Sequence, residues 1–339
     1  MRIRETPAAP ATLAVLGAGS WGTALAAHLV SRGHSVRLWG HLSEHIRTLK
    51  HDGENRAFLP GVPLPPDLTP TDDLGATLEA ADDVLLVVPS HVFQTVLEQC
   101  GSLPHRRLAW AAKGLEYRSG RFLHEVARDA LPGLEAMAVL SGPTFAGEVA
   151  RGLPTAITVA ADDPGFADRW AGYLNGPRFR AYTSDDLIGV QLGGAVKNVL
   201  AIAAGIADGL GFGANSRAAL ITRGLAEMMR LGRALGGHTE TFMGLAGQGD
   251  LVLTCTDDQS RNRRLGLALG RGESMDAARK RIGQVTEGVF ATAEIHALAE
   301  RTGVEMPICR ATYDVLYAGL PPKEAAQRLF ARDIKPESA

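Results

Sequence analysis

Cysteine is scarce in this chain of 339 residues. Its three cysteines, Cys100, Cys255 and Cys309, are far apart and do not have the spacing of metal ligands. Few, dispersed cysteines are typical of a reducing compartment, where they serve as small apolar side chains. No histidine neighbours Cys255 to activate it as a nucleophile. We therefore expect buried thiols that serve packing, and no metal site.

A strong charge of one sign is also missing, since the formal net charge is only −2. A protein without a basic excess has no sequence-independent attraction for nucleic acid. We therefore expect no nucleic-acid partner, and any anionic ligand has to be bound by local cations or helix ends. Residues 1–11 contain no apolar segment of the kind found in secretory signals.

One apolar stretch, residues 188–206, is nearly long enough to cross a membrane. Lys197 and Asn198 stand near its centre, and several glycines interrupt it. Charged and polar groups in the middle of a membrane span are costly. The stretch is therefore predicted to be a buried helix of a soluble protein, and no membrane span is expected.

The length and the order of the apolar segments indicate two domains. A chain of 339 residues exceeds one ordinary domain, and 45% hydrophobic with 21% charged residues is typical of globular proteins. In the first half, predicted strands alternate with helical stretches, as in a parallel doubly wound sheet. The predicted strands are residues 12–16, 35–39, 84–88, 108–112, 138–140, 156–160 and 179–182. Residues 60–70 are expected to form a proline-rich loop.

Helical stretches dominate after about residue 184, and glycine-rich breaks separate them. The breaks fall at residues 209–213, 236–237 and 270–272. We therefore predict the α/β class, with two domains. An N-terminal Rossmann-type doubly wound domain covers residues 1–187, and an all-α C-terminal domain covers residues 188–339.

A glycine pattern follows the first predicted strand and opens a helix. Gly17, Gly19 and Gly22 have the G-x-G-x-x-G spacing of dinucleotide-binding sites, in the strand–turn–helix context that the pattern requires. Gly17 permits a tight turn, Gly19 lets the backbone approach a pyrophosphate, and Gly22 allows close packing of helix on strand. The helix N-terminus then offers unpaired N–H groups to phosphates. A purely structural turn is the alternative.

The second predicted strand does not end in an acidic residue. NAD-binding domains usually have an Asp or Glu about 20 residues after the glycines, where it binds the ribose. Here the strand is followed by Gly40 and His41, with Arg37 and Arg47 nearby. The missing carboxylate favours NADP(H), or use of both NADP(H) and NAD(H), over strict use of NAD(H). The alternative is that the arginines are solvated surface charges.

Other predicted strand ends carry polar or small residues, and ligands of open α/β sheets bind beyond such ends. Ser90 is placed to face the cofactor, and Lys113 to meet a substrate phosphate or carbonyl. Residues 141–146, Ser-Gly-Pro-Thr-Phe-Ala, are small enough for a ligand to approach the backbone. An ordinary Gly-Pro turn is the alternative for that run, and His91 is expected to begin a helix.

Lys197 is the most informative residue of the second half. It lies in the run Gly-Gly-Ala-Val-Lys-Asn-Val-Leu, inside an otherwise apolar helix. A lysine in apolar surroundings loses hydration and its pKa tends to fall, which makes it a candidate proton donor near neutral pH. The alternative is a lysine that extends its ammonium group to solvent. Asp250 is a candidate partner that would orient it.

The run Ser-Arg-Asn-Arg-Arg, which begins at Ser260, is predicted to bind an anion. The planar guanidinium of Arg261 suits a phosphate. The short hydroxyl of Ser260 and the amide of Asn262 complete such a site. Arg263 and Arg264 are expected on an exposed basic face of a helix.

Together these motifs resemble those of bacterial-type NAD(P)-dependent glycerol-3-phosphate dehydrogenases. The resemblance covers residues 13–317 and rests on the runs 17–22, 141–146, 193–198, 247–250 and 260–262. It implies the interconversion of dihydroxyacetone phosphate and NAD(P)H with sn-glycerol 3-phosphate and NAD(P)+, with Lys197 as proton donor and acceptor. It also implies a cytoplasmic homodimer that supplies glycerol phosphate for phospholipid synthesis.

The resemblance further implies which residues bind the two ligands. For the substrate these are Lys113, Gly142, Thr144, Lys197, Asp250, Ser260, Arg261 and Asn262. For the cofactor, the glycines Gly17, Gly19 and Gly22 are joined by Ser20, Trp21, His41, Lys113, Ala146, Arg261, Val285 and Glu287.

Two other functions are considered for a chain with a dinucleotide-binding domain. A β-hydroxyacid dehydrogenase also combines a Rossmann domain with a helical domain, but its lysine and asparagine stand one helical turn apart, whereas Lys197 and Asn198 are adjacent. A non-catalytic protein that senses NADP would bind nucleotide without turnover. That function leaves the set Lys197, Asp250 and Arg261 unexplained.

Overall fold

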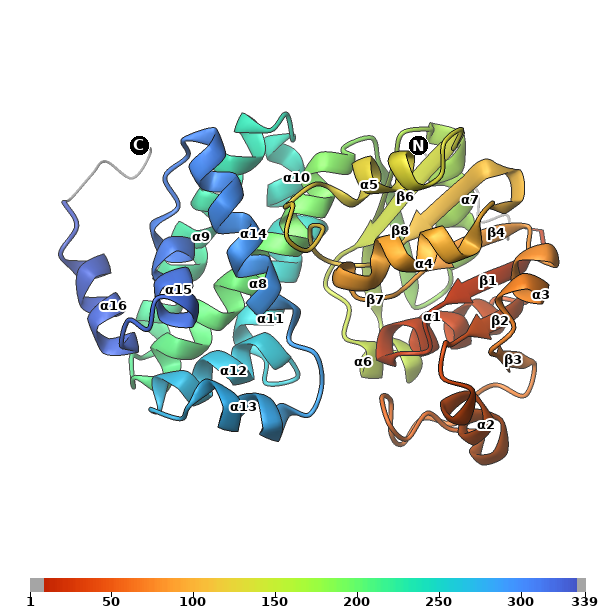
Figure 1. Ribbon diagram of the computed structural model, residues 1–339, viewed down its shortest axis with the longest axis horizontal. Coiled ribbons are helices and arrows are strands. Elements are labelled where there is room, and N and C mark those ends of the chain that lie inside the picture. The colour runs from red at the N-terminus through yellow and green to blue at the C-terminus, as the bar shows by residue number, and fades with distance from the viewer. Residues whose placement is uncertain (1–8, 334–339) are drawn as a thin grey trace. The chain divides into compact units, whose positions relative to one another are not determined.

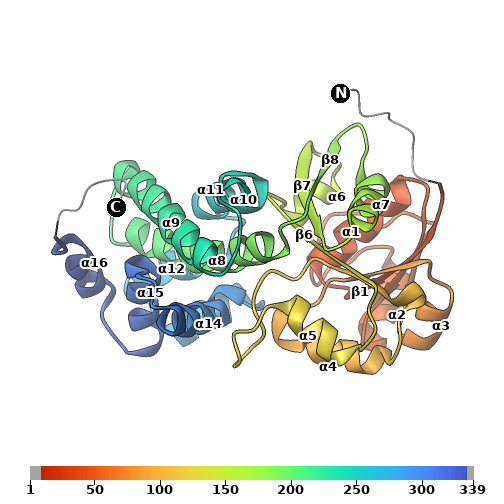
Figure 2. The ribbon, with the colours of Figure 1, turned by 90° about the horizontal axis from the view of Figure 1, so that it is seen from above.

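The computed structural model describes residues 9–333, which form two compact units (Figure 1, Figure 2). The first unit comprises the described residues up to Glu116, together with Arg121–Gln191. The second comprises Tyr117–Gly120 and the described residues from Leu192 onward. The predicted domain boundary lies at the start of helix α8 (Leu187–Gly209), and the two units divide within that helix.

An eight-stranded sheet in the order β3-β2-β1-β4-β5-β6-β7-β8 forms the centre of the first unit. Its strands are β1 (Thr12–Leu16), β2 (Ser35–Trp39), β3 (Leu68–Thr71), β4 (Asp83–Leu86), β5 (Arg107–Trp110), β6 (Ala136–Ser141), β7 (Thr155–Ala161) and β8 (Phe179–Ser184). The strands β1 to β6 are parallel and have the 3-2-1-4-5-6 order of dinucleotide-binding folds. The predicted Rossmann-type sheet is confirmed.

Helices cover both faces of this sheet, with α4 and α5 on one face and α1 and α7 on the other (Figure 2). The helices are α1 (Ser20–Ser31), α2 (Ser43–Asp52), α3 (Leu74–Glu79), α4 (Phe93–Cys100), α5 (Leu123–Ala130), α6 (Ala146–Ala150) and α7 (Pro164–Leu174). Because both faces are covered, the central strands are mainly apolar, and Leu13, Ala14, Val15 and Leu16 of β1 are completely buried.

Residues 60–70, expected to be a loop, enter strand β3 at Leu68. Pro70 of this strand lies opposite Leu38 of β2. A proline cannot donate a hydrogen bond, but an edge strand tolerates it because only one side is paired. The strand is at the edge of the sheet, with β2 as its single neighbour.

Strand β7 runs antiparallel to β6 and so departs from the predicted parallel doubly wound sheet. The connection between the two strands, residues 142–154, contains only one short helix, α6, whose five residues span about 7.5 Å. A strand of six residues such as β6 is about 20 Å long. The helix is therefore too short to return the chain to the start of β6. The 11 residues of α7 provide a longer crossover, and β8 is parallel to β7.

The second unit is helical throughout its described part, with the breaks that the glycines predict. After α8 the helices are α9 (Ala214–Ala234), α10 (Thr239–Met243), α11 (Asp250–Thr256), α12 (Arg261–Gly270), α13 (Met275–Ile282), α14 (Glu287–Thr302), α15 (Pro307–Tyr317) and α16 (Pro322–Phe330). By length and composition α8 could cross a membrane, but 89% of its apolar window is buried inside the protein. The predicted buried core helix is confirmed.

The segment Tyr117–Gly120 belongs to the second unit because it packs on α14. The rings of Tyr117 and Phe290 meet edge to face, 5.2 Å between centroids. Arg301 donates a hydrogen bond of 3.1 Å from Nη1 to the carbonyl of Ser119.

A buried carboxyl group caps helix α15. Glu227 of α9 accepts hydrogen bonds from the backbone N–H groups of Ile308 at 2.7 Å and Cys309 at 3.1 Å. Burial removes water from this carboxyl and raises its pKa from 4.5 to about 7, although the two N–H groups act in the opposite direction. The carboxyl therefore stays protonated to a higher pH in the folded protein than in the unfolded chain.

We expect Glu227→Gln to change how stability depends on pH. Above the unfolded pKa of 4.5 the folded protein retains a proton that the unfolded chain releases, so the contribution of Glu227 to stability falls as the pH rises toward 7. The shift corresponds to about 3 kcal/mol. The Tm of the variant should therefore rise relative to wild type between pH 5 and pH 8. Glu300→Gln, at an exposed ion pair, should follow wild type, and a constant difference for Glu227→Gln would contradict the expectation.

Candidate active site

The turn between β1 and α1 has the backbone geometry that a dinucleotide site requires. Gly17 has a φ of 124°, and a Cβ atom there would lie 2.4 Å from the carbonyl oxygen of Val87. A Cβ atom at Gly22 would lie 1.9 Å from the carbonyl oxygen of Gly17. At Gly19, by contrast, no atom lies within 4 Å of the Cβ position. Two glycines thus allow close backbone packing, and the third leaves open space at the N-terminus of α1, where a pyrophosphate fits.

The predicted cofactor residues around this turn differ in exposure. Ser20 is the first residue of α1, and Trp21 follows it with a buried indole Nε1 that has no hydrogen-bond partner. His41 lies beyond β2 and is exposed. Arg37 is half-buried and donates to the carbonyl of Ala76 at 3.2 Å, so it is partly engaged within the unit.

Three predicted substrate residues of the first unit meet at one carbonyl group. Lys113, beyond the end of β5, donates from Nζ to the carbonyl oxygen of Gly142 at 2.9 Å. The hydroxyl of Thr144 donates to the same oxygen at 3.1 Å. Because β5 and β6 are adjacent and parallel, their carboxyl ends lie at the same edge of the sheet, where ligands of such folds bind. Ala146 begins α6, which packs on α1.

In the second unit, Lys197 forms a buried ion pair with Asp250. Lys197 extends from α8, and the residue is only 6% exposed. The alternative of a lysine that reaches solvent is therefore wrong. Its Nζ donates to Asp250 Oδ1 at 2.7 Å and to Thr254 Oγ1 at 3.1 Å. The carboxylate favours the charged ammonium, and burial opposes it. The arrangement is a desolvated ammonium group that donates to two oxygens.

Thr254 is a contact of Lys197 that the sequence analysis did not include among the site residues. It lies four residues after Asp250 and therefore on the same face of the helix. Its hydroxyl donates to the backbone carbonyl of Asp250 at 2.6 Å while it accepts from Lys197. The spacing i, i+4 from Asp250 is the signal that could have identified it.

The predicted anion-binding run opens helix α12. Ser260 is its N-cap and accepts from the backbone N–H of Arg263 at 3.2 Å. Arg261 is half-buried, and its Nη1 donates to Gln284 Oε1 at 3.1 Å. A guanidinium group thus stands at a helix N-terminus, two features that favour an anion.

Asn262 joins three helices through its amide. Its Nδ2 donates to Asn198 Oδ1 of α8 at 2.8 Å, and its Oδ1 accepts from the backbone N–H of Gly288 in α14 at 3.0 Å. This connection brings the beginning of α14, with Glu287 as its first residue, close to the neighbour of Lys197. Val285, just before α14, is 41% exposed. The Nδ2 group of Asn198 is buried and has no hydrogen-bond partner.

The prediction that Arg263 lies on an exposed face is wrong. Arg263 is 8% exposed; its Nη2 pairs with Asp208 at 2.6 Å, and its Nε donates to the carbonyl of Cys255 at 3.0 Å. Arg264 is half-buried. The sequence could not predict this burial, because the partner of Arg263 is Asp208, which lies in another helix, α8.

The three cysteines are buried and free, as predicted. Burial raises the pKa of Cys255 to about 12 and that of Cys100 to about 11, so neither thiol is activated as a nucleophile. Within residues 9–333, no group of three or more His, Cys, Asp or Glu side chains is arranged to hold a metal ion.

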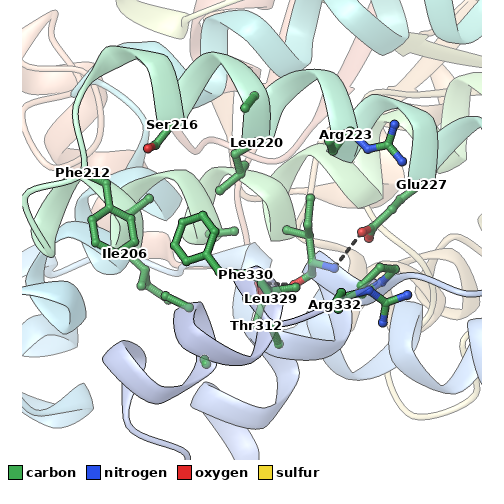
Figure 3. Close-up of a pocket in the computed structure, with 18 of the residues that line it drawn as sticks. Ile206, Phe212, Ser216, Leu220, Arg223, Glu227, Thr312, Leu329, Phe330 and Arg332 are labelled. Carbon is green, nitrogen blue, oxygen red and sulfur yellow. Dashed lines mark hydrogen bonds between the residues drawn. The ribbon is translucent and has the colours of Figure 1, made fainter. Parts of the chain in front are cut away.

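A cavity of about 760 Å³ in the second unit lies between α9, α15 and α16 (Figure 3). Phe212, Leu220 and Phe330 line its apolar part, and Arg223 and Glu227 lie at its other end. None of the predicted substrate or cofactor residues lines it. The candidate site is therefore defined by the chemistry around Lys197 rather than by this cavity.

Comparisons with known proteins agree with this chemistry. A family model described as the NAD-dependent glycerol-3-phosphate dehydrogenase N-terminus matches residues 12–167, and the corresponding C-terminus model matches residues 186–327. The chain is 57% identical over 332 residues to a glycerol-3-phosphate dehydrogenase [NAD(P)+] of Shewanella halifaxensis, covering 97% of this chain and 98% of the relative. It is 58% identical over 328 residues to that of Aeromonas salmonicida, covering 96% and 98%.

A solved structure is similar over nearly the whole chain. The crystal structure of glycerol-3-phosphate dehydrogenase from Coxiella burnetii has a TM-score of 0.90 and 48% sequence identity. The match covers 95% of this chain and 99% of that protein.

We expect Gly19→Ala and Gly22→Ala to act differently. The methyl group of Gly19→Ala enters open space, so the Tm should stay within a few degrees of wild type while NADPH binds at least about tenfold more weakly, a loss of about 1.4 kcal/mol. Gly22→Ala forces its methyl group against the Gly17 carbonyl and should lower the Tm as well. NADPH fluorescence titration and thermal unfolding measure the two effects. Unchanged NADPH affinity of Gly19→Ala would contradict the assignment.

Proposed function

This chain belongs to the family of NAD-dependent glycerol-3-phosphate dehydrogenases, and we propose that it reversibly reduces dihydroxyacetone phosphate to sn-glycerol 3-phosphate with NAD(P)H. The observation that carries this proposal is the buried Lys197 ammonium, 2.7 Å from Asp250. A ketone oxygen becomes negatively charged as its carbon is reduced. A desolvated ammonium group beside it stabilises that charge and supplies the proton.

In this proposal Lys197 donates a proton during reduction and accepts it during oxidation. Asp250 and Thr254 hold the Nζ atom in one place through hydrogen bonds of 2.7 and 3.1 Å. Because the position of a general acid controls its efficiency, these contacts orient the proton toward the substrate oxygen. Asp250 also pairs with the ammonium at 2.7 Å, which favours its charged form against the effect of burial.

The proposed cofactor site is assembled from the glycine-rich turn and the residues near it. When bound, NAD(P)H supplies the hydride. The open space at Gly19 and the N-terminus of α1 support a pyrophosphate there. The absence of an acid after β2, with exposed His41 and Arg47, supports use of NADP(H) as well as NAD(H). The further cofactor residues are Gly17, Ser20, Trp21, Gly22, Lys113, Ala146, Arg261, Val285 and Glu287.

The proposed substrate residues fall into two groups. Lys113, Gly142 and Thr144 are in contact within the first unit. Lys197, Asp250, Ser260, Arg261 and Asn262 lie in the second unit. We assign the phosphate to Arg261, because its guanidinium stands at the N-terminus of α12. The hydrogen bonds of Ser260 and Asn262 hold that N-terminus in place.

The wider role proposed for this chain follows its family. The functional domains would be residues 1–187 for the dinucleotide and residues 188–339 for the substrate. We further propose a cytoplasmic homodimer that supplies glycerol phosphate for phospholipid synthesis. Sedimentation equilibrium tests the assembly, and a monomer at micromolar concentration would contradict it.

One assay distinguishes the proposed reaction from its alternatives. NADPH absorbance should fall when dihydroxyacetone phosphate is added, and NADP+ should not be reduced by β-hydroxy acids. A β-hydroxyacid dehydrogenase gives the opposite pattern, and a nucleotide sensor gives no turnover with either substrate.

We expect Lys197→Met to lower kcat by about 10²- to 10⁴-fold, the usual range for general acid–base groups. Lys280→Met, at an exposed lysine of the same unit, is the matched control and should retain activity. Thermal unfolding and NADPH titration verify that both variants are folded. A kcat of Lys197→Met near that of wild type would remove Lys197 from the proposed role.

Arg261→Ala should act on binding rather than on proton transfer. Loss of the guanidinium removes a charge-assisted contact worth about 1.5–3 kcal/mol, so KM for dihydroxyacetone phosphate should rise at least about tenfold with the fold intact. Arg271→Ala, an exposed arginine just after the same helix, serves as the control. Steady-state kinetics measure the effect, and an unchanged KM would rule out this phosphate assignment.

A further inference from the structure

One glycine of α8 lies directly against the turn that leads into Asp250. A Cβ atom at Gly193 would lie 2.5 Å from the carbonyl oxygen of Ala246 and 3.5 Å from the Cα atom of Gly247. Real Cβ atoms do not approach a backbone oxygen this closely. The backbone of the turn therefore rests on the backbone of α8, with no side chain between them.

This turn, Leu245–Gly249, is π-helical and runs directly into α11. The N–H of Gly249 donates to the carbonyl of Gly244 at 3.0 Å. On another side, a Cβ atom at Gly247 would lie 2.1 Å from the carbonyl oxygen of Phe242 in α10. The turn is thus held between α8 and α10, and π-helical turns are frequent at functional sites.

The Gly193–Ala246 contact lies four residues before the Lys197–Asp250 ion pair on both segments. Gly193 precedes Lys197 by four residues, and Ala246 precedes Asp250 by four residues. Residues four apart lie on the same side of a helix, one turn from each other. The two segments therefore meet twice, first through their backbones at Gly193 and then through the Lys197–Asp250 hydrogen bond of 2.7 Å.

We propose that Gly193 is a positioning residue for the reaction. Its lack of a side chain lets the π-helical turn approach α8 closely enough for Asp250 to reach Lys197. The inference rests on the proposed role of Lys197 as proton donor and acceptor. A methyl group at residue 193 would push the turn away by about 1 Å, enough to take a short hydrogen bond beyond the normal range.

The test compares Gly193→Ala with Gly209→Ala. Gly209 lies on the same helix, and a Cβ atom there would also be 2.5 Å from a carbonyl oxygen, that of Leu267 in α12. Both variants should lower the Tm to a similar degree. Gly193→Ala alone should lower kcat, by about 10- to 100-fold, with KM for dihydroxyacetone phosphate within about threefold. Equal kcat values for the two variants would overturn the proposal.

A compensating substitution separates positioning from a general loss of structure. Asp250→Glu lengthens the carboxyl side chain by one methylene group, so alone it should lower kcat because the carboxylate is displaced. Combined with Gly193→Ala it should recover part of the activity, because the longer side chain bridges the widened gap. If the fold-decrease in kcat of the double variant equals the product of the two single fold-decreases, the sites act independently and the proposal is contradicted.

If Gly193→Ala does not yield folded protein, Ala246→Gly loosens the same turn without adding an atom. It should lower kcat more than Ala268→Gly, a change at an equally buried alanine of α12, and equal losses would overturn the proposal. Lys197→Met separates the two levels of inference. If it retains activity, the proposed role of Lys197 fails, and the role of Gly193 fails with it. If it loses activity while Gly193→Ala behaves like Gly209→Ala, only the role of Gly193 fails.

Discussion

The buried ion pair between Lys197 and Asp250 constrains how α8 and α11 pack in the second unit. An isolated ammonium in the most apolar helix of the chain would lose several kcal/mol of hydration. The carboxylate at 2.7 Å and the hydroxyl of Thr254 at 3.1 Å replace that hydration. Since both partners come from α11, the segment before α11 has to keep one register against α8. The buried charge of Lys197 is thus also a requirement on how helices pack.

Glycine makes this packing possible. A Cβ atom at Gly205 of α8 would lie 2.1 Å from the carbonyl of Arg263, and one at Gly266 of α12 would lie 2.0 Å from the carbonyl of Ile202. The two helices therefore cross at backbone contact. That approach lets the amide of Asn262 reach Asn198 at 2.8 Å. The glycine-rich turn of the first unit uses the same device, since Gly17 and Gly22 are in backbone contact there.

Several polar residues have structural partners as well as proposed ligands. Ser260 caps α12, and Asn262 connects α8, α12 and α14. Lys113 and Thr144 share the carbonyl of Gly142. Such hydrogen bonds fix the direction of a side chain or a helix N-terminus before a substrate arrives, which lowers the cost of ordering the site on binding. Residues that look equivalent as ligands in the sequence thus differ in the structural element that each one holds in place.

Local patterns in the sequence determined the Rossmann-type sheet, the glycine-rich turn after β1 and the buried helix that carries Lys197, because burial and turn chemistry act between near neighbours. Lys113, Arg261 and Asp250 could be proposed from their residue types and from the resemblance to a family. The direction of β7, the edge strand β3 and the burial of Arg263 could not, because each depends on the length of a connection or on a partner from another helix. Asp250 could be proposed as a partner of Lys197 from its residue type, but only the tertiary structure brings it, 53 residues further along the chain, within 2.7 Å of Lys197. A short segment of sequence cannot specify which distant charged residues will pair in a buried site, because helix packing determines which side chains meet.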